Sequence, residues 1–161
     1  MTFDIGLTEP SDERVIAVEE LQSKTLVSPV SGLASDYLNL FNELVIMLEQ
    51  IPAMPELFED LCAWRPVSYE EYFRKSQLPG RHSALAAYQE LGPTFRRRFE
   101  SFVAELDVVA LASVASVRRQ LRDGPPQDME RLKETCARAG EKMRVILLRA
   151  SRLVNYANLE G

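Results

Sequence analysis

The chain has 161 residues and a mass of 18.3 kDa, enough for one domain with a substantial core. With 46% hydrophobic and 27% charged residues it is too apolar for a disordered protein. The net charge of −5 is unevenly spread. Residues 1–64 hold twelve acidic and two basic residues, whereas residues 65–161 hold twelve acidic and seventeen basic ones. Either the acidic segments pack beside the basic ones, or a basic face is offered to an acidic partner.

Cysteine usage and the ends of the chain bear on the compartment. Cys62 and Cys136 lie in apolar contexts and form no CxxC motif, so reduced core thiols are expected. The acidic N-terminus has neither the basic start nor the apolar stretch of a secretory signal. The uncharged stretch Val108–Val117 is about half as long as a membrane span. We therefore expect a cytoplasmic protein without a membrane partner.

Apolar residues recur at helical spacing almost throughout, which predicts an all-α fold. The sequence contains no repeat, low-complexity tract or Gly/Ser linker. We therefore expect a single all-helical domain over residues 1–161, with residues 1–10 as an irregular N-terminal segment. The first helix is expected to begin near Ser11, with acidic residues in its first turn, and to fade near Thr25.

A second helix is predicted over residues 36–51, capped by Ser35. It is apolar on most sides, so it is expected to be buried at the centre of the bundle. Its narrow polar line consists of Asn39, Asn42, Glu43, Glu49 and Gln50. Three short helices are predicted next, over residues 56–64, 68–76 and 83–91. Ser68 and Glu71 have the spacing of a capping box at the start of one of them.

The two longest helices are predicted over about residues 93–122 and 127–156, separated by the turn sequence Asp123-Gly124-Pro125-Pro126. In the second of them, apolar residues alternate spacings of three and four without interruption, as in antiparallel helix packing. This seam consists of Met129, Leu132, Cys136, Ala139, Met143, Ile146, Ala150, Leu153 and Ala157. The sequence therefore predicts a long C-terminal antiparallel helical hairpin, within a bundle of four helical columns of which one is broken.

The stretch Val108–Val117 is uncharged around the whole circumference of its helix. Either neighbouring helices bury it on all sides, or a second subunit covers it. The second alternative predicts a symmetric homodimer through this region.

The search for chemistry gives no catalytic, cofactor-binding or metal-binding residue. His82 is the single histidine, and no glutamate precedes it by three residues, which excludes His-rich and di-iron sites. It stands at a predicted helix start with Leu85 three positions later, unlike the histidine of a phosphotransfer domain. Motifs of nucleotide-binding enzymes, serine hydrolases and zinc proteases are absent. The sequence therefore predicts a protein that is not an enzyme and needs no cofactor.

Candidate partner-binding residues fall in two groups. Trp64, Tyr69 and Tyr72 lie beside Arg74 and Arg81 in the broken-helix region, and these residue types dominate protein-binding hot spots. The alternative is a corner packed by amphipathic side chains. The second group, in the first turns of a long helix where the helix dipole disfavours cations, is Arg96, Arg97 and Arg98.

The leading hypothesis is a non-enzymatic helical interaction or regulatory protein that binds another protein through the broken-helix corner or a basic face. The alternative hypothesis is a small-molecule-binding or sensor bundle with an apolar cavity between the second helix and the hairpin. A nucleic-acid partner is not expected, because the isoelectric point is near 5.0 and no helix-turn-helix or basic aromatic pattern occurs.

Overall fold

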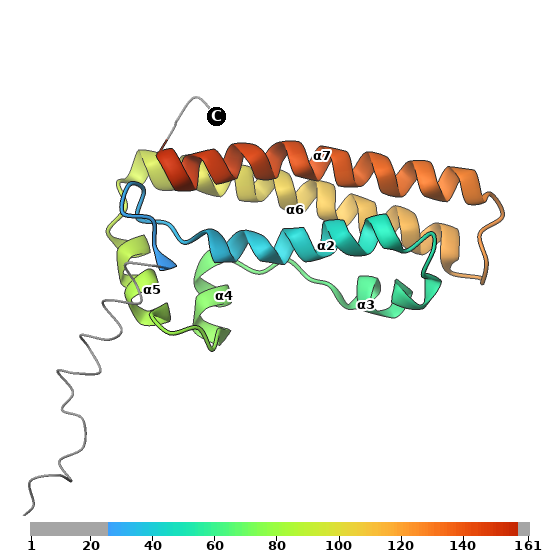
Figure 1. Cartoon of the computed structure of the whole chain (residues 1–161), viewed down its shortest axis with the longest axis horizontal. Coiled ribbons are helices and arrows are strands. Elements are labelled where there is room, and N and C mark those ends of the chain that lie inside the picture. Colours follow the sequence, from blue (N-terminus) through green and yellow to red (C-terminus); the bar gives the residue numbers. More distant parts are fainter. Residues whose placement is uncertain (1–25, 158–161) are drawn as a thin grey trace, which may run out of the picture.

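The structure, a computed structural model, describes residues 26–157 and is all-helical over that range. The predicted segment 1–10 and helix 11–25 lie outside the described residues. The elements are η1 (Ser35–Leu38), α2 (Asn39–Gln50), η2 (Pro55–Leu57), α3 (Phe58–Ala63), α4 (Tyr69–Lys75), α5 (Arg81–Gln89), α6 (Pro93–Leu121) and α7 (Met129–Tyr156). Figure 1 shows α2, α6 and α7 side by side, with α3, α4 and α5 grouped below α2. The predicted all-α bundle is confirmed.

The predicted C-terminal hairpin is formed by α6 and α7, which run antiparallel (Figure 1). Gly124 makes the turn at a φ of +110°, which disfavours a residue with a Cβ. Asp128 then caps α7 by accepting a hydrogen bond from the Arg131 amide at 3.0 Å. Every seam residue from Leu132 to Leu153 is buried, as predicted. Met129, at the open start of α7, is 39% exposed.

Helix α2 packs its apolar side against α7, and its predicted polar line is exposed. The Arg144 guanidinium of α7 donates to Oε1 of Glu49 from Nε at 2.9 Å and from Nη2 at 2.6 Å. A Cβ on Gly140 would come within 3.1 Å of the Glu49 carboxylate, so this glycine allows the close approach. The prediction that Ser35 caps an α-helix was wrong. The first turn is the 3-10 helix η1, which Ser35 begins, and no side chain caps it.

The short helices follow the predicted breaks with small shifts. Ser68 Oγ accepts a hydrogen bond from the Glu71 amide at 3.1 Å, which confirms the predicted cap of α4. The Glu71 carboxylate pairs with Lys75 at 2.7 Å. Helix α5 begins at Arg81, two residues before the predicted start, because Gly80 adopts a φ of +83° and turns the chain there.

An aromatic cluster joins the short helices to the long ones. The Tyr37 ring lies 5.3 Å from that of Tyr69 and 6.1 Å from that of Phe99, between centroids. The Tyr37 hydroxyl donates to the Val67 carbonyl at 2.7 Å, and the Ala34 amide donates to the Tyr69 hydroxyl at 2.9 Å. These bonds satisfy buried polar groups, so η1, α4 and α6 are held together by oriented contacts as well as by apolar area.

Replacing Ser68 with alanine removes the only side-chain cap of α4. We expect Ser68→Ala to lower the free energy of unfolding by about 1 kcal/mol, measured by urea denaturation. Ser101 is exposed in the middle of α6, so Ser101→Ala is the matched control and should cost nothing. An equal loss in both variants would contradict the capping role.

The fold should lose stability in alkaline solution. Burial raises the pKa of the Cys136 thiol to about 11 and that of the Tyr69 hydroxyl to about 12, from ordinary values of 9.0 and 10.0. Burial also raises the pKa of Tyr37. Because these groups ionise more readily in the unfolded chain, their stabilising contribution is complete below the ordinary pKa values and falls as the pH rises through them. Thermal unfolding followed by circular dichroism from about pH 8 to about pH 11 should show a falling midpoint; a constant midpoint would contradict the burial.

Candidate functional site

Two of the predicted partner-binding aromatics lie in the core. Trp64 is 7% exposed and Tyr69 is 3% exposed. The Trp64 indole Nε1 donates to the Leu40 carbonyl at 3.0 Å, so its polar group is satisfied inside the protein. For these two residues the alternative interpretation, a corner packed by amphipathic side chains, is the correct one. They expose almost no surface that a partner could contact.

The accessible part of the corner is small. Tyr72 is half-buried beside an open hollow of about 400 Å³, which is also lined by Asp36, Glu71 and Lys75. Arg74 is exposed. Arg81 donates to the Ser76 carbonyl at 2.7 Å and thereby holds the turn before α5. Their use by a partner stays a prediction.

The three consecutive arginines of α6 point to different surroundings. The Arg96 guanidinium lies 5.8 Å from the centre of the Tyr88 ring, and its Nε is 3.9 Å from Glu100. That of Arg98 lies 4.7 Å from the centre of the Phe102 ring, with Nε buried and unpaired within the described part of the chain. Arg97 is exposed. Adjacent positions diverge on a helix, so the triplet forms no single basic patch.

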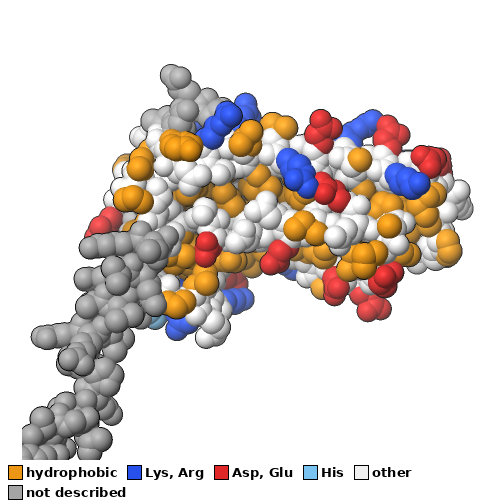
Figure 2. Space-filling view, in the orientation of Figure 1, with side chains coloured by type: hydrophobic (Ala, Val, Ile, Leu, Met, Phe, Trp, Pro, Cys, Tyr) orange, Lys and Arg blue, Asp and Glu red, His pale blue; other side chains and the backbone are white. Residues whose placement is uncertain are grey.

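A longer basic surface runs along the outer side of α7. The exposed basic and apolar side chains that share this side at helical spacing, together with the carboxylate of Glu134, are Arg131, Arg138, Lys142, Val145, Arg149, Arg152 and Tyr156. We call them the basic row. Val145 is 55% exposed and Tyr156 is 72% exposed. Figure 2 shows basic side chains interspersed with acidic ones over α7, and a group of acidic side chains over the α3 end of the opposite edge.

The basic row is only partly neutralised by ion pairs. Arg138 Nη2 lies 2.6 Å from the carboxylate of Glu134, one turn earlier. Between residues 26 and 157, the pair of Arg144 with Glu49 is the one ion pair that joins the acidic first half to the basic second half. Lys142 and Arg149 have no carboxylate within 4 Å in that range. Among the described residues, direct neutralisation of one half by the other is therefore limited to this contact.

The spacing on α7 could have shown this row from the sequence. Positions 131, 138, 142, 149 and 152 return to one side of a helix. The same helix also carries Arg144, which the fold directs toward Glu49 of α2 and away from this row.

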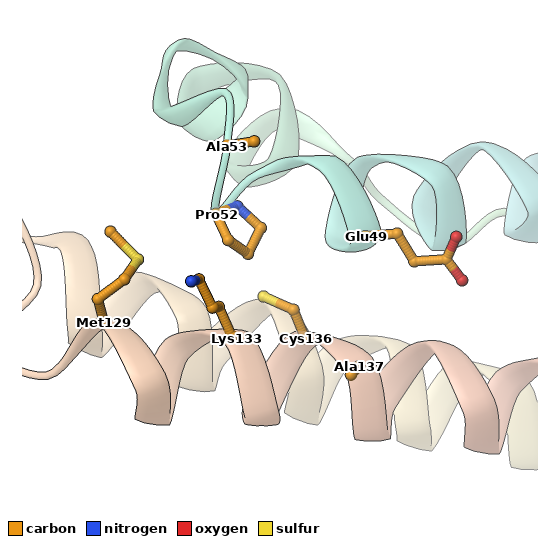
Figure 3. Close-up of a pocket in the computed structure, with 7 residues that line it drawn as sticks. All are labelled: Glu49, Pro52, Ala53, Met129, Lys133, Cys136 and Ala137. Carbon is orange, nitrogen blue, oxygen red and sulfur yellow. The ribbon is translucent and has the colours of Figure 1, made fainter.

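A hollow of about 540 Å³ lies between the C-terminal end of α2 and α7 (Figure 3). Glu49, Pro52 and Ala53 line it from one side, and Met129, Lys133, Cys136 and Ala137 line it from α7. An apolar hollow of about 350 Å³ adjoins it, since Pro52 and Met129 line both. Exposed Met129 and Lys133 leave the larger hollow open to solvent.

Two of the polar groups at this hollow are a buried thiol and a paired lysine. Burial raises the pKa of the Cys136 thiol to about 11, so the group is neutral near pH 7 and a poor nucleophile. Lys133 Nζ lies 3.4 Å from the Glu130 carboxylate. Both cysteines are free thiols, as predicted, and Cys136 is in the core.

Other site types lack support within residues 26–157. No group of three or more His, Cys, Asp or Glu residues there could hold a metal ion. His82 is exposed in the first turn of α5. Within the same range, no helix has the length and apolar character that a membrane crossing requires.

No family model, curated protein or solved structure matches the chain. The interpretation of its surfaces therefore depends on their geometry, exposure and charge.

The two cysteines should differ sharply toward a thiol reagent. Half-buried Cys62 is expected to react with a chromogenic disulfide while the protein is folded, and buried Cys136 only after unfolding. Absorbance during labelling should show one fast thiol per chain in the native protein and two in denaturant. Cys62→Ser should abolish the fast phase. A fast phase that survives this substitution would contradict the burial of Cys136.

Proposed function

We propose that the protein is a non-enzymatic helical interaction protein that binds an acidic segment of another protein along the basic row of α7. The observation that carries this proposal is the alignment of five basic side chains with exposed Val145 and Tyr156 on one side of one helix. A row from residue 131 to residue 156 is about 37 Å long at about 1.5 Å per residue. That length suits an acidic helix lying along α7.

The mixture of charge and apolar surface favours a protein partner. Val145 and Tyr156 can pack against apolar side chains of the partner, whereas arginines around them pair with its carboxylates. Nucleic acid would use the charges but leave the apolar contacts without a partner. A cytoplasmic location and a homodimer through Val108–Val117 remain part of the proposal. Two free cysteines support a reducing compartment.

Charge reversal at the free end of the row tests this function. The tagged full-length chain is used to retain proteins from nuclease-treated host lysate at moderate salt. We expect Arg149→Glu with Arg152→Glu to lower retention of the bound protein by about tenfold, because two ion-pairing positions become repulsive. Higher salt should weaken wild-type retention in the same direction.

The matched control reverses two exposed charges among the sequence-predicted candidates, Arg74→Glu with Arg97→Glu. Retention should survive this change, with the bound protein identified by mass spectrometry. Loss in the control alone would place the interaction at Arg74 or Arg97 and contradict the basic row. Material retained from an untreated lysate but not from the nuclease-treated one would contradict a protein partner.

The hollow between α2 and α7 favours a second candidate function, binding of a small apolar molecule. Its 540 Å³ is within the usual size of ligand pockets, and apolar groups of Pro52, Met129 and Cys136 line it. A thermal-shift screen of small apolar compounds should then find a ligand that raises the melting temperature. Ala137→Trp, at an exposed edge of the hollow, should abolish that shift, whereas Ala86→Trp at an exposed position of α5 should preserve it. The same shift in both variants would exclude the hollow.

A further inference from the structure

The outer side of α6 carries an apolar stripe that no described element covers. Ala104, Val108, Leu111, Ala112 and Ala115 recur at helical spacing on this side. Val108 is 69% exposed and Leu111 is 49% exposed. Of the two explanations for the uncharged stretch Val108–Val117, burial by neighbours on all sides is therefore contradicted within the described residues.

The stripe is suited to a close helix–helix contact. Three of its five members are alanines, which allow two helix backbones to approach, and Val108 and Leu111 supply the larger contacts. The stripe spans about 17 Å at about 1.5 Å per residue. At one edge it adjoins the basic row, because Val108 and Ala112 line an open hollow together with Arg138 and Lys142 of α7.

The charges beside the stripe of one chain are opposite in sign to those they would meet on a second chain related by a two-fold rotation. Glu105 and Arg119 lie on one flank, seven residues before and after Ala112. An antiparallel copy of α6 centred on Ala112 therefore brings Glu105 of each chain opposite Arg119 of the other. Both side chains are exposed, and neither has an ion-pair partner within residues 26–157. A uniformly acidic or basic partner would meet repulsion at one of these two positions, whereas a second copy satisfies both.

We propose that two copies of this chain associate through antiparallel α6 helices, with the apolar stripe at the centre and reciprocal Glu105–Arg119 ion pairs at one flank. The contact is isologous, so it closes on itself and gives a dimer rather than a fibre. It deepens the homodimer named in the proposed function, to which it adds a register and flanking ion pairs, and it does not depend on the acidic partner of the basic row.

The mass of the full-length chain in solution tests the pairing. Size-exclusion chromatography with light scattering should give twice the 18.3 kDa of one chain. Val108→Asp should give the monomer mass with an unchanged circular dichroism spectrum, since a 69% exposed position tolerates charge in the monomer. Val145→Asp, on the outer side of α7 at 55% exposure, is the control and should remain dimeric.

A charge exchange tests the register. Glu105→Arg alone and Arg119→Glu alone each place like charges together, so each should raise the dimer dissociation constant about tenfold. The double variant restores opposite charges with reversed sign and should restore the dimer. A geometry in which these residues do not meet would show no such recovery.

Three results would overturn the proposal: a monomeric wild-type chain, a Val108→Asp variant that remains dimeric, or no recovery in the double variant. The proposed function fails separately, because it is measured by loss of a bound protein on Arg149→Glu with Arg152→Glu. A monomer that still retains its partner would refute the dimer alone.

Discussion

The antiparallel contact between α6 and α7 is the constraint on which the rest of the structure depends. Two helices of 29 and 28 residues meet along an unbroken line of buried residues. Such a hairpin still exposes apolar surface on both helices unless other elements cover it. Helix α2 is 12 residues long and covers the groove over part of that length. The remaining elements must close the side below α2, and the outer sides of the hairpin stay open.

The aromatic cluster covers the side of the hairpin below α2 with few residues. Short helices bury little area each, so large rings provide contact that backbone length does not. Tyr37 reaches from η1 to Val67, and Tyr69 receives the amide of Ala34. Ser31 Oγ donates to the Val154 carbonyl and joins the same region to the end of α7. The cluster therefore fixes the ends of the long helices, which explains why residue types common in binding hot spots serve the core here.

Local patterns in the sequence predicted most of the fold and little of the candidate site. The hairpin follows from periodicity, and its observed ends lie within two residues of those expected, because caps such as Asp128 and breaks such as Gly124 are local. Burial of Trp64 and Tyr69 depends on which helices meet, which spacing along the chain does not determine. The same limit applies to Arg144, whose partner Glu49 is 95 residues away. The charged residues of a helix can be counted from the sequence. Whether a partner can reach them depends on which other elements of the fold pack beside them.

The distribution of charge separates the two exposed surfaces of the hairpin. Along α7 the row is basic and cannot be complementary to a copy of itself, so it requires an acidic partner. On the outer side of α6, Glu105 and Arg119 lie on one flank of the apolar stripe. A second copy related by a two-fold rotation can therefore pair each Glu105 with the Arg119 of the other chain. The two surfaces adjoin at the hollow that Val108 and Ala112 of α6 line together with Arg138 and Lys142 of α7. A dimer through α6 would present two basic rows, and a partner with two acidic segments would then gain avidity from the assembly.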